Sequence, residues 1–265
     1  GKCIKDCTLC SQVCPGKDVP ILEIPKQFDE NEPFQKGWGY YRDIFLGRIK
    51  DEGIKKESTS GGAVTAILLA ALKKKIIDGA IIVGSDPKAP YKSIAMIATT
   101  EEDIIGGVQS KYVVTPVNQM LKELDKSKSY AIVALPCQII GLKKIAILNP
   151  DLVRNIRFTI GLFCHSTMYF KGTKDLIQRS GVKRFDEIKK IRYRQGDFPG
   201  GFVVETETGL TKRIALSEYM PLFGRYMLNR CRLCIHHFNV LCDIAVADPF
   251  PFLDELKAQD KKWTV

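Results

Sequence analysis

The sequence contains no apolar run long enough to cross a lipid bilayer as a helix. Its longest run, residues 66–72, falls well short of the roughly 18 residues that such a helix needs. The chain also shows no signal peptide, no P-loop, no G-x-G-x-x-G fingerprint, no internal repeat and no low-complexity tract. No nucleic-acid-binding motif accompanies its positive charge, and no Ser/His/Asp triad stands out. We therefore expect no membrane span and no nucleic-acid partner.

Composition limits the architecture and the partners. A chain of 265 residues with 45% apolar content can bury a substantial core, as one large domain or as a domain with an appendage. Its formal net charge is +10 and its lysines are scattered, so a solvated surface is the simplest interpretation. The same charge would also suit an acidic protein partner or a cofactor that carries phosphate.

The cysteines form the most informative pattern. There are nine, closely spaced, which favours metal ligation over disulfide bonds and predicts a reducing, cytoplasmic environment. Cys3, Cys7, Cys10 and Cys14 form the run C-x3-C-x2-C-x3-C, directly followed by Pro15, which is close to the bacterial ferredoxin pattern that binds a 4Fe–4S cluster. Four thiolates would also suit a structural zinc ion. Zinc sites usually pair two C-x2-C motifs across a longer gap, so the compact run favours a cluster over zinc.

A second group of cysteines is dispersed along the chain. Cys231 and Cys234 form a C-x2-C motif, while Cys137 and Cys164 each come at the end of an expected buried strand. Two cysteines at the carboxyl ends of strands would be able to converge with the C-x2-C motif on a second cluster. They would also suit a role as buried structural cysteines, which many cores contain, and spacing alone favours that interpretation.

The hydrophobic pattern alternates between helices and strands. We expect helices at 63–75 and 116–124, and strands at 80–84, 91–98, 130–135, 156–163, 188–194, 202–207 and 210–214. Mixed α/β is therefore the predicted fold class. The apolar run 240–246 contains Cys242, which we expect in the core.

A turn rich in serine and glycine precedes the first expected helix. It reads Ser58-Thr59-Ser60-Gly61-Gly62. Free N–H groups at a helix N-terminus, hydroxyl donors and close backbone approach at glycine would together bind phosphate. Serine and glycine are also ordinary capping residues, and without other signals a plain cap is the preferred interpretation.

Five short motifs occur in a particular order: Ser60-Gly61-Gly62 with Val64-Thr65, Ser110-Lys111-Tyr112, Pro136-Cys137-Gln138, Gly161-Leu162-Phe163-Cys164 and Cys231-Arg232-Leu233-Cys234. In this order they resemble the beta subunits of the deazaflavin-dependent (coenzyme F420) hydrogenase and formate dehydrogenase. That family also includes the dehydrogenase half of a sulfite reductase and the 7-hydroxymethyl chlorophyll a reductase of plants. The resemblance covers nearly the whole chain, from Cys3 to about Val265.

The resemblance implies an oxidoreductase built around FAD and 4Fe–4S clusters, two of them in this chain. Members of the family pass a hydride between coenzyme F420 and the flavin, and single electrons between the flavin and the clusters. A flavin is needed between them because a deazaflavin carries hydride, whereas a cluster carries one electron. The expected partners are ferredoxin or a catalytic or electron-transfer subunit.

The resemblance also assigns residues by position. The FAD phosphate turn would be Ser60, Gly61, Gly62 and Thr65, the flavin pocket would include Lys111 and Tyr112, and the cluster beside it would be held by Cys137, Cys164, Cys231 and Cys234. The N-terminal run would hold an additional cluster. Residues 1–24 would thus form a short ferredoxin-like segment, and residues 25–265 a mixed-sheet FAD- and deazaflavin-binding domain with the second cluster.

Three further expectations concern the second half of the chain. Arg192 and Arg194 would bind the anionic phosphate and glutamate tail of the coenzyme, although an exposed strand face is an equal alternative. His236 and His237 are expected at the surface or behind the ligands. Residues 262–265 look like the start of a strand, so we expect the natural sequence to continue, and the start at Gly1 suggests an upstream piece.

Alternative functions remain open at this point. One is a reductase that runs from ferredoxin toward an organic substrate. Another is a non-catalytic relay subunit with clusters but no flavin of its own. A zinc-stabilised binding protein is the third.

Overall fold

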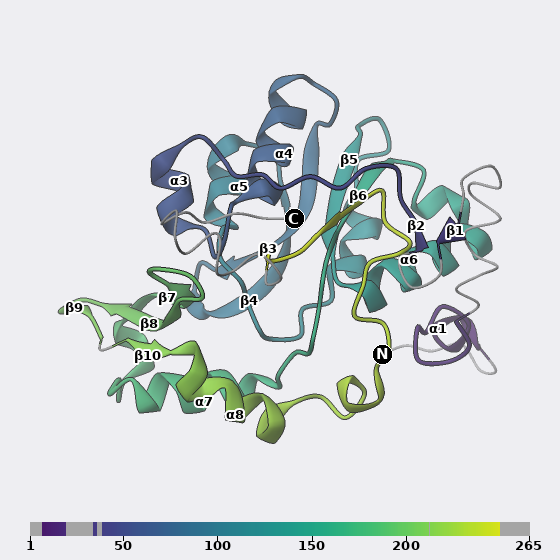
Figure 1. The fold of residues 1–265 in the computed structure, drawn as a ribbon. Coiled ribbons are helices and arrows are strands. Elements are labelled where there is room, and N and C mark those ends of the chain that lie inside the picture. The colour runs from purple at the N-terminus through teal and green to yellow at the C-terminus, as the bar shows by residue number, and fades with distance from the viewer. Residues whose placement is uncertain (1–6, 20–33, 36–38, 212, 250–265) are drawn as a thin grey trace.

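A five-stranded sheet forms the centre of the computed structural model, which describes residues 7–19, 34–35, 39–211 and 213–249 (Figure 1). The strand order is β11-β6-β5-β3-β4. The first four strands run parallel, and β4 pairs antiparallel with β3 at one edge. The bounds are Gly79–Asp86 for β3, Ala89–Ala98 for β4, Tyr130–Ala134 for β5, Ile156–Leu162 for β6 and Ile244–Val246 for β11.

Helices cover both faces of this sheet. The helices are α4 (Ala63–Lys73) and α5 (Glu101–Gly106) on one side, and α6 (Pro136–Leu148) and the 3-10 helix η1 (Val117–Glu123) on the other. Side chains of neighbouring strand residues point to opposite faces, so Ile81 joins Ile139 in one buried cluster whereas Ala80 joins Leu68 in another. The result is a three-layer arrangement with two cores.

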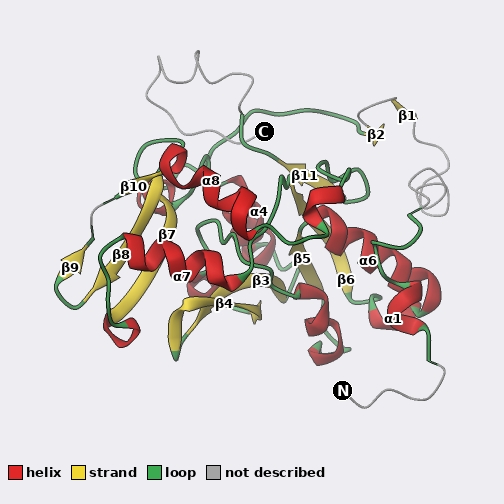
Figure 2. Cartoon of the chain, turned by 90° about the horizontal axis from the view of Figure 1, so that it is seen from below, coloured by secondary structure: helices red, strands yellow, loops and turns green. Residues whose placement is uncertain are grey.

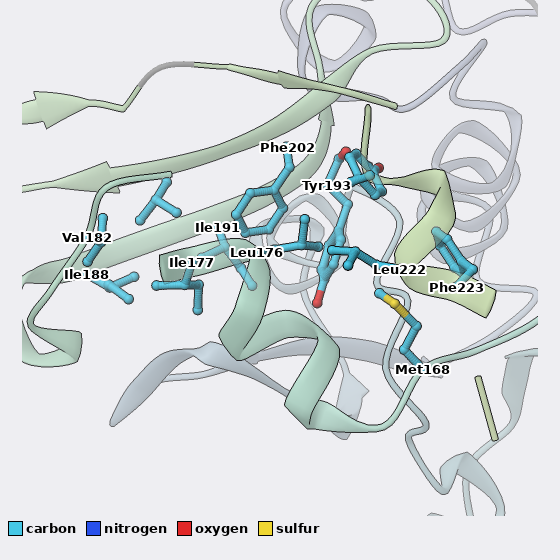
Figure 3. Close-up of a cluster of buried hydrophobic side chains, with 12 residues drawn as sticks. Met168, Leu176, Ile177, Val182, Ile188, Ile191, Tyr193, Phe202, Leu222 and Phe223 are labelled. Atoms are coloured by element: carbon cyan, nitrogen blue, oxygen red, sulfur yellow. The ribbon is translucent and has the colours of Figure 1, made fainter. Parts of the chain in front are cut away.

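A smaller unit, residues 168–228, packs beside the central sheet and is called the second unit below. Its antiparallel sheet has the order β10-β8-β7, with β9 also paired to β8. Its elements are α7 (Phe170–Arg179), β7 (Ile188–Gln195), β8 (Gly201–Thr206), β9 (Gly209–Leu210), β10 (Ile214–Ala215) and α8 (Leu216–Tyr226). Figure 3 shows its core, in which Leu176 of α7 and Leu222 of α8 lie with Tyr193 and Phe202 of the sheet.

The remaining elements are short. They are α1 (Leu9–Gln12), β1 (Phe34–Gln35), β2 (Gly39–Tyr40), α3 (Glu52–Glu57), η2 (Pro150–Leu152), η3 (Phe185–Glu187) and η4 (Cys231–Leu233). Figure 2 shows α1 beside α6. Among the described residues, no helix is both long and apolar enough to cross a membrane.

The predicted α/β class is confirmed, and most predicted strands are present at nearly the expected bounds. One expectation was wrong in detail, because the expected strand 210–214 is divided between β9 and β10. The helix expected at 116–124 is present as a 3-10 helix over residues 117–123. The long helix α6 was not predicted, because its apolar residues are spread around the helix and show little periodicity.

Gly161 of β6 lets a later loop approach the central sheet. A Cβ atom at this position would overlap Asn239 and the sulfur of Cys242. Asn239 is buried, and its side-chain nitrogen donates to the carbonyl of Leu162 at 2.6 Å. Cys242, expected in the core, is partly buried here and packs against the cluster on the α6 face. The glycine therefore sets how closely residues 237–242 lie to the end of β6.

We expect Gly161→Ala to lower the free energy of unfolding by about 1–3 kcal/mol, because the added methyl group has no room. Gly224→Ala is the matched control: a Cβ there meets nothing within 4 Å, and alanine in helix α8 should be neutral or stabilising by about 0.5–1 kcal/mol. Urea denaturation measures both. Equal stability of the two variants would contradict the close approach.

Candidate functional site

A cavity of about 690 Å³ lies at the carboxyl ends of β5, β6 and β11. Residues after these strands line it, among them Leu135, Cys164 and Asp248, and the second unit contributes Arg194 and Phe223. In open α/β sheets, ligands bind in the crevice at this edge. The volume falls within the range of sites for cofactors and other small molecules.

The predicted phosphate turn forms one wall of the cavity. The lining includes Ser60, Gly62 and Thr65. The helix α4, which is eleven residues long, begins at this turn. Gly62 has a φ of +72°, and a Cβ atom would come within 2.8 Å of the Ser58 hydroxyl, so glycine is required. The carbonyl of Gly61 accepts a hydrogen bond from the Ile49 N–H at 2.7 Å, which fixes the turn.

The segment that contains Lys111 and Tyr112 adjoins this turn. The backbone N–H and the hydroxyl of Ser110 lie 2.9 and 3.0 Å from the Thr59 hydroxyl oxygen, which accepts from the N–H. The side-chain nitrogen of Gln109 donates to the carbonyl of Glu57. Gln109 itself has a φ of +90°, a conformation that costs free energy for a residue with a side chain. Residues far apart in the sequence thus form one continuous wall.

Lys111 is held by the backbone of its own segment. Its ammonium donates to the carbonyls of Gly107, Val108 and Gln109 at 2.9, 3.2 and 3.1 Å. Burial lowers the pKa of this ammonium to about 8, and the charge of Lys190 contributes to the shift. The three carbonyls favour the charged form and so oppose that shift.

Tyr112 lies at the centre of an aromatic group that joins the cavity to the second unit. Its ring meets those of Tyr193 and Phe223 edge to face, with centroids 5.4 and 5.1 Å apart. Burial raises the pKa of the Tyr112 phenol, while the neighbouring Arg194 guanidinium opposes that increase. The segment 112–114 also pairs with Met168, at the start of the second unit.

The two arginines of β7 have different surroundings. Arg192 is bound to Glu57 and Glu205, with nitrogen–oxygen distances of 3.1 and 2.7 Å, so its charge is compensated outside the cavity lining. Arg194 is buried and lines the cavity. It donates to the carbonyl of Pro199 at 2.7 Å and to the carboxylate of Asp248 at 2.5 Å. Of the two, Arg194 is the one placed to contact a ligand.

The second group of cysteines converges in space. Cys137 lies in the first turn of α6, Cys164 follows β6, and Cys231 and Cys234 lie in and after η4. Burial raises the pKa of the Cys164 thiol to about 12, and each of the other three thiols adds to this increase. Cys164 also lines the cavity. The family resemblance grouped these four cysteines, and their role as cluster ligands stays a prediction.

These cysteines do not form a compact site for one ion. Among the described residues, no three histidine, cysteine, aspartate or glutamate side chains are arranged to hold a single metal ion. Zinc requires such a compact tetrahedral set.

The N-terminal cysteines lie beside α6. Cys10 lies in α1, Cys7 and Cys10 are exposed, and Cys14 is partly buried. Cys3 lies outside the described residues. The Cys14 sulfur accepts from the Gly16 N–H at 3.4 Å, and this hydrogen bond is the main cause that lowers the pKa of the Cys14 thiol. Lys144 of α6 donates to the Cys14 carbonyl, and Arg230, the residue before Cys231, lies 3.9 Å from the Cys14 sulfur, so the described part of this run is attached to the core.

Sequence reasoning missed Gln109 and Ser166. Each of them, like the proposed Arg194, contains a buried polar atom with no hydrogen-bond partner among the described residues and lines the cavity. Such atoms are uncommon in folded proteins and indicate a polar ligand or a bound water. The His237 ring nitrogen lies 2.9 Å from the carbonyl of Cys164, a proposed ligand, and His237 also lines the cavity. The sequence offered one signal for these two residues. Gln109 directly precedes the motif at 110–112, and Ser166 follows the motif at 161–164 by two residues.

We expect Lys111→Met to lower the free energy of unfolding by about 1–3 kcal/mol, since three carbonyls lose their donor. The folded-state pKa of about 8 lies below the usual 10.5, so the unfolded chain binds more protons between these values. The stability of the natural chain should therefore rise with pH from 8 to 10.5 relative to the variant. Denaturant unfolding at several pH values measures this. Parallel pH profiles would show that Lys111 does not titrate in this window.

Comparison with known proteins identifies the relatives of this chain. The chain is 26% identical to a coenzyme F420-dependent sulfite reductase of Methanocaldococcus jannaschii, over 93% of this chain and 42% of that protein. It is 27% identical to the coenzyme F420 hydrogenase subunit beta of Methanosarcina barkeri, over 78% of this chain and 70% of that subunit. The chain thus spans less than half the length of the sulfite reductase.

Two further comparisons agree. A chain of the F420-reducing [NiFe] hydrogenase complex from Methanosarcina barkeri has the same fold, with a TM-score of 0.65, 23% identity and coverage of 88% of this chain and 84% of that chain. Family models match residues 44–122, as the N-terminal part, and 127–265, as the C-terminal part. The chain belongs to the coenzyme F420 hydrogenase/dehydrogenase beta subunit family.

Proposed function

We propose that this chain is an iron–sulfur flavoprotein oxidoreductase. In this proposal it exchanges a hydride between coenzyme F420 and FAD, and single electrons between FAD and 4Fe–4S clusters. The observation that carries the proposal is the position of Cys164, which belongs to the four-cysteine group and also lines the cavity. A ligand in the cavity would therefore lie against the cysteine group.

The names of the relatives support the choice of substrate. They include F420-dependent enzymes that act on hydrogen, formate and sulfite. The partner chemistry differs among them, whereas coenzyme F420 is common to all three. We propose that coenzyme F420 is also the substrate of this chain, and that the final electron donor or acceptor is a partner subunit or ferredoxin.

Three observations support FAD as the proposed ligand of the cavity. Its lining is mostly apolar, which suits a flat ring system, and polar atoms without partners lie in its wall. One end has the N-terminus of α4 with Ser60, Gly62 and Thr65, where N–H and hydroxyl groups would hold phosphate. Its volume of about 690 Å³ is sufficient for a large cofactor.

The chain's own residues would position the cofactor and control its surroundings. Lys111 holds the 107–111 segment in place and puts a positive charge in the cavity wall, and Arg194 lies beside Tyr112 with its charge paired to Asp248. The apolar side chains Leu68, Val133 and Leu162 would exclude water from the ring. When bound, a flavin accepts a hydride as an electron pair and gives up electrons singly, which clusters carry onward.

The cysteines divide into two proposed cluster sites. Cys137, Cys164, Cys231 and Cys234 would hold the cluster nearest the cavity, and the N-terminal run with Cys7, Cys10 and Cys14 would hold the other. Residues 1–24 would form the iron–sulfur segment, and residues 25–265 the flavin- and deazaflavin-binding domain. Arg194 is the arginine of β7 that we propose as a ligand contact, since Arg192 is bound by two carboxylates.

A cofactor inventory tests this function. Iron, acid-labile sulfide, zinc and flavin would be measured on protein purified without oxygen, and reduction of coenzyme F420 would then be assayed. Two clusters and one FAD for each chain, with coenzyme turnover, are the expected result. Clusters without flavin would indicate a relay subunit, activity only with ferredoxin would indicate a different reductase, and zinc without flavin would overturn the proposal.

We expect Cys234→Ser to remove about half of the iron and sulfide, because one of two cluster sites loses a thiolate. Cys242→Ser is the control, since Cys242 is a partly buried cysteine outside both groups and packs in the core. The control should retain the full iron content. Equal iron loss in both variants, measured per folded chain, would mean that the loss follows from general instability rather than ligation.

A further inference from the structure

The N-terminal cysteine segment is docked onto the core rather than merely tethered to it. The ammonium of Lys144, in α6, donates to the carbonyls of Cys14, Lys17 and Asp18 at 3.2, 2.9 and 2.8 Å. Val19 packs against the buried cluster on the same side of the sheet. Figure 2 shows α1 alongside α6, whose first turn carries Cys137. One helix therefore contacts both cysteine groups.

Along α6, the two attachment points are close. Cys137 and Lys144 are seven residues apart, which corresponds to about 10 Å along the helix axis. The segment held by Lys144 contains Cys14, and Cys137 belongs to the group beside the cavity. The two proposed cluster sites are thus neighbours.

Arg230 lies between the two groups. It directly precedes Cys231, yet its guanidinium points back to the N-terminal segment, where Nη1 lies 3.9 Å from the Cys14 sulfur. A Cβ atom at Gly16 would overlap the same nitrogen, so the guanidinium packs directly over this backbone. The backbone of Arg230 leads directly into Cys231, the first cysteine of the second group's C-x2-C motif. A single cation therefore contacts one group and belongs to the residue directly before the other group's C-x2-C motif.

We propose that Arg230 couples the two cluster sites of this chain, as a positioning residue that fixes their relative placement and raises the reduction potentials of both. The inference rests on the proposed function. In the exchange between the sites, one centre loses one electron and the other gains it, so no proton or further reactant is required.

The physical reason is the sign of the charge. Reduction makes each cluster more negative, and a nearby cation stabilises the reduced form more than the oxidised form. N–H donation toward a ligand sulfur acts in the same direction. Because Arg230 acts on both groups, it also lessens the repulsion between two centres that are both reduced.

Arg232 provides a matched control. It lies within the same C-x2-C motif and carries the same charge, but its guanidinium donates to the carbonyl of Gly224 in α8 at 2.7 Å. A change at Arg232 therefore alters the net charge of the motif without altering the contact with Cys14.

The test is an anaerobic redox titration of the iron-loaded chain, followed by electron paramagnetic resonance. In the natural chain, full reduction should broaden the signals by spin interaction between neighbouring centres. Arg230→Gln should shift both midpoint potentials to more negative values. Arg230→Lys should give a smaller shift because it keeps the charge, and Arg232→Gln should leave both potentials nearly unchanged.

Several outcomes would overturn the inference. These are a shift at one centre only, no shift at either centre, or equal shifts in Arg230→Gln and Arg232→Gln. The natural chain alone can also overturn the inference, if its fully reduced form shows no spin interaction between the two centres. A chain that binds FAD but only one cluster would overturn this inference and leave the flavoprotein proposal standing, whereas absence of FAD would count against the proposed function itself.

Discussion

The parallel pairing of β5, β6 and β11 is the constraint on which the site depends. Parallel strands end at the same edge, so the segments that follow them are brought together regardless of their distance in sequence. Cys137 follows β5, Cys164 follows β6 and Asp248 follows β11. Gly161 allows the loop after the C-x2-C motif to pack against the same edge. The cavity and the cysteine group are thus consequences of one topology.

Positive charge is the second recurring feature of this edge. Lys111 is enclosed by carbonyls, Arg194 is paired with Asp248, and Arg230 lies between two groups of cysteines. Burying a cation is costly unless its neighbours compensate it, and carbonyls and Asp248 do so for Lys111 and Arg194. Arg230 is exposed and lies against the Cys14 sulfur.

Much of this could be predicted from the sequence, and the limits have physical causes. The β-strands could be identified because short apolar runs between turns are a local signal. Helix α6 could not, since its apolar residues have no clear period, and so the role of Lys144 in holding the N-terminal segment stayed hidden. The two arginines of β7 looked equivalent in sequence, and only their partners separate them. Long-range contacts such as that of Arg230 with Cys14 leave no local pattern at all.

The central claim is that a flavin binds in the cavity beside the cysteine group. Photolabelling with an azido derivative of FAD, followed by peptide mapping, tests it most directly. The account predicts saturable labelling within residues 58–68, 107–115 and 162–167, which FAD should prevent. Labelling elsewhere on the chain, or labelling that excess FAD does not reduce, would contradict it.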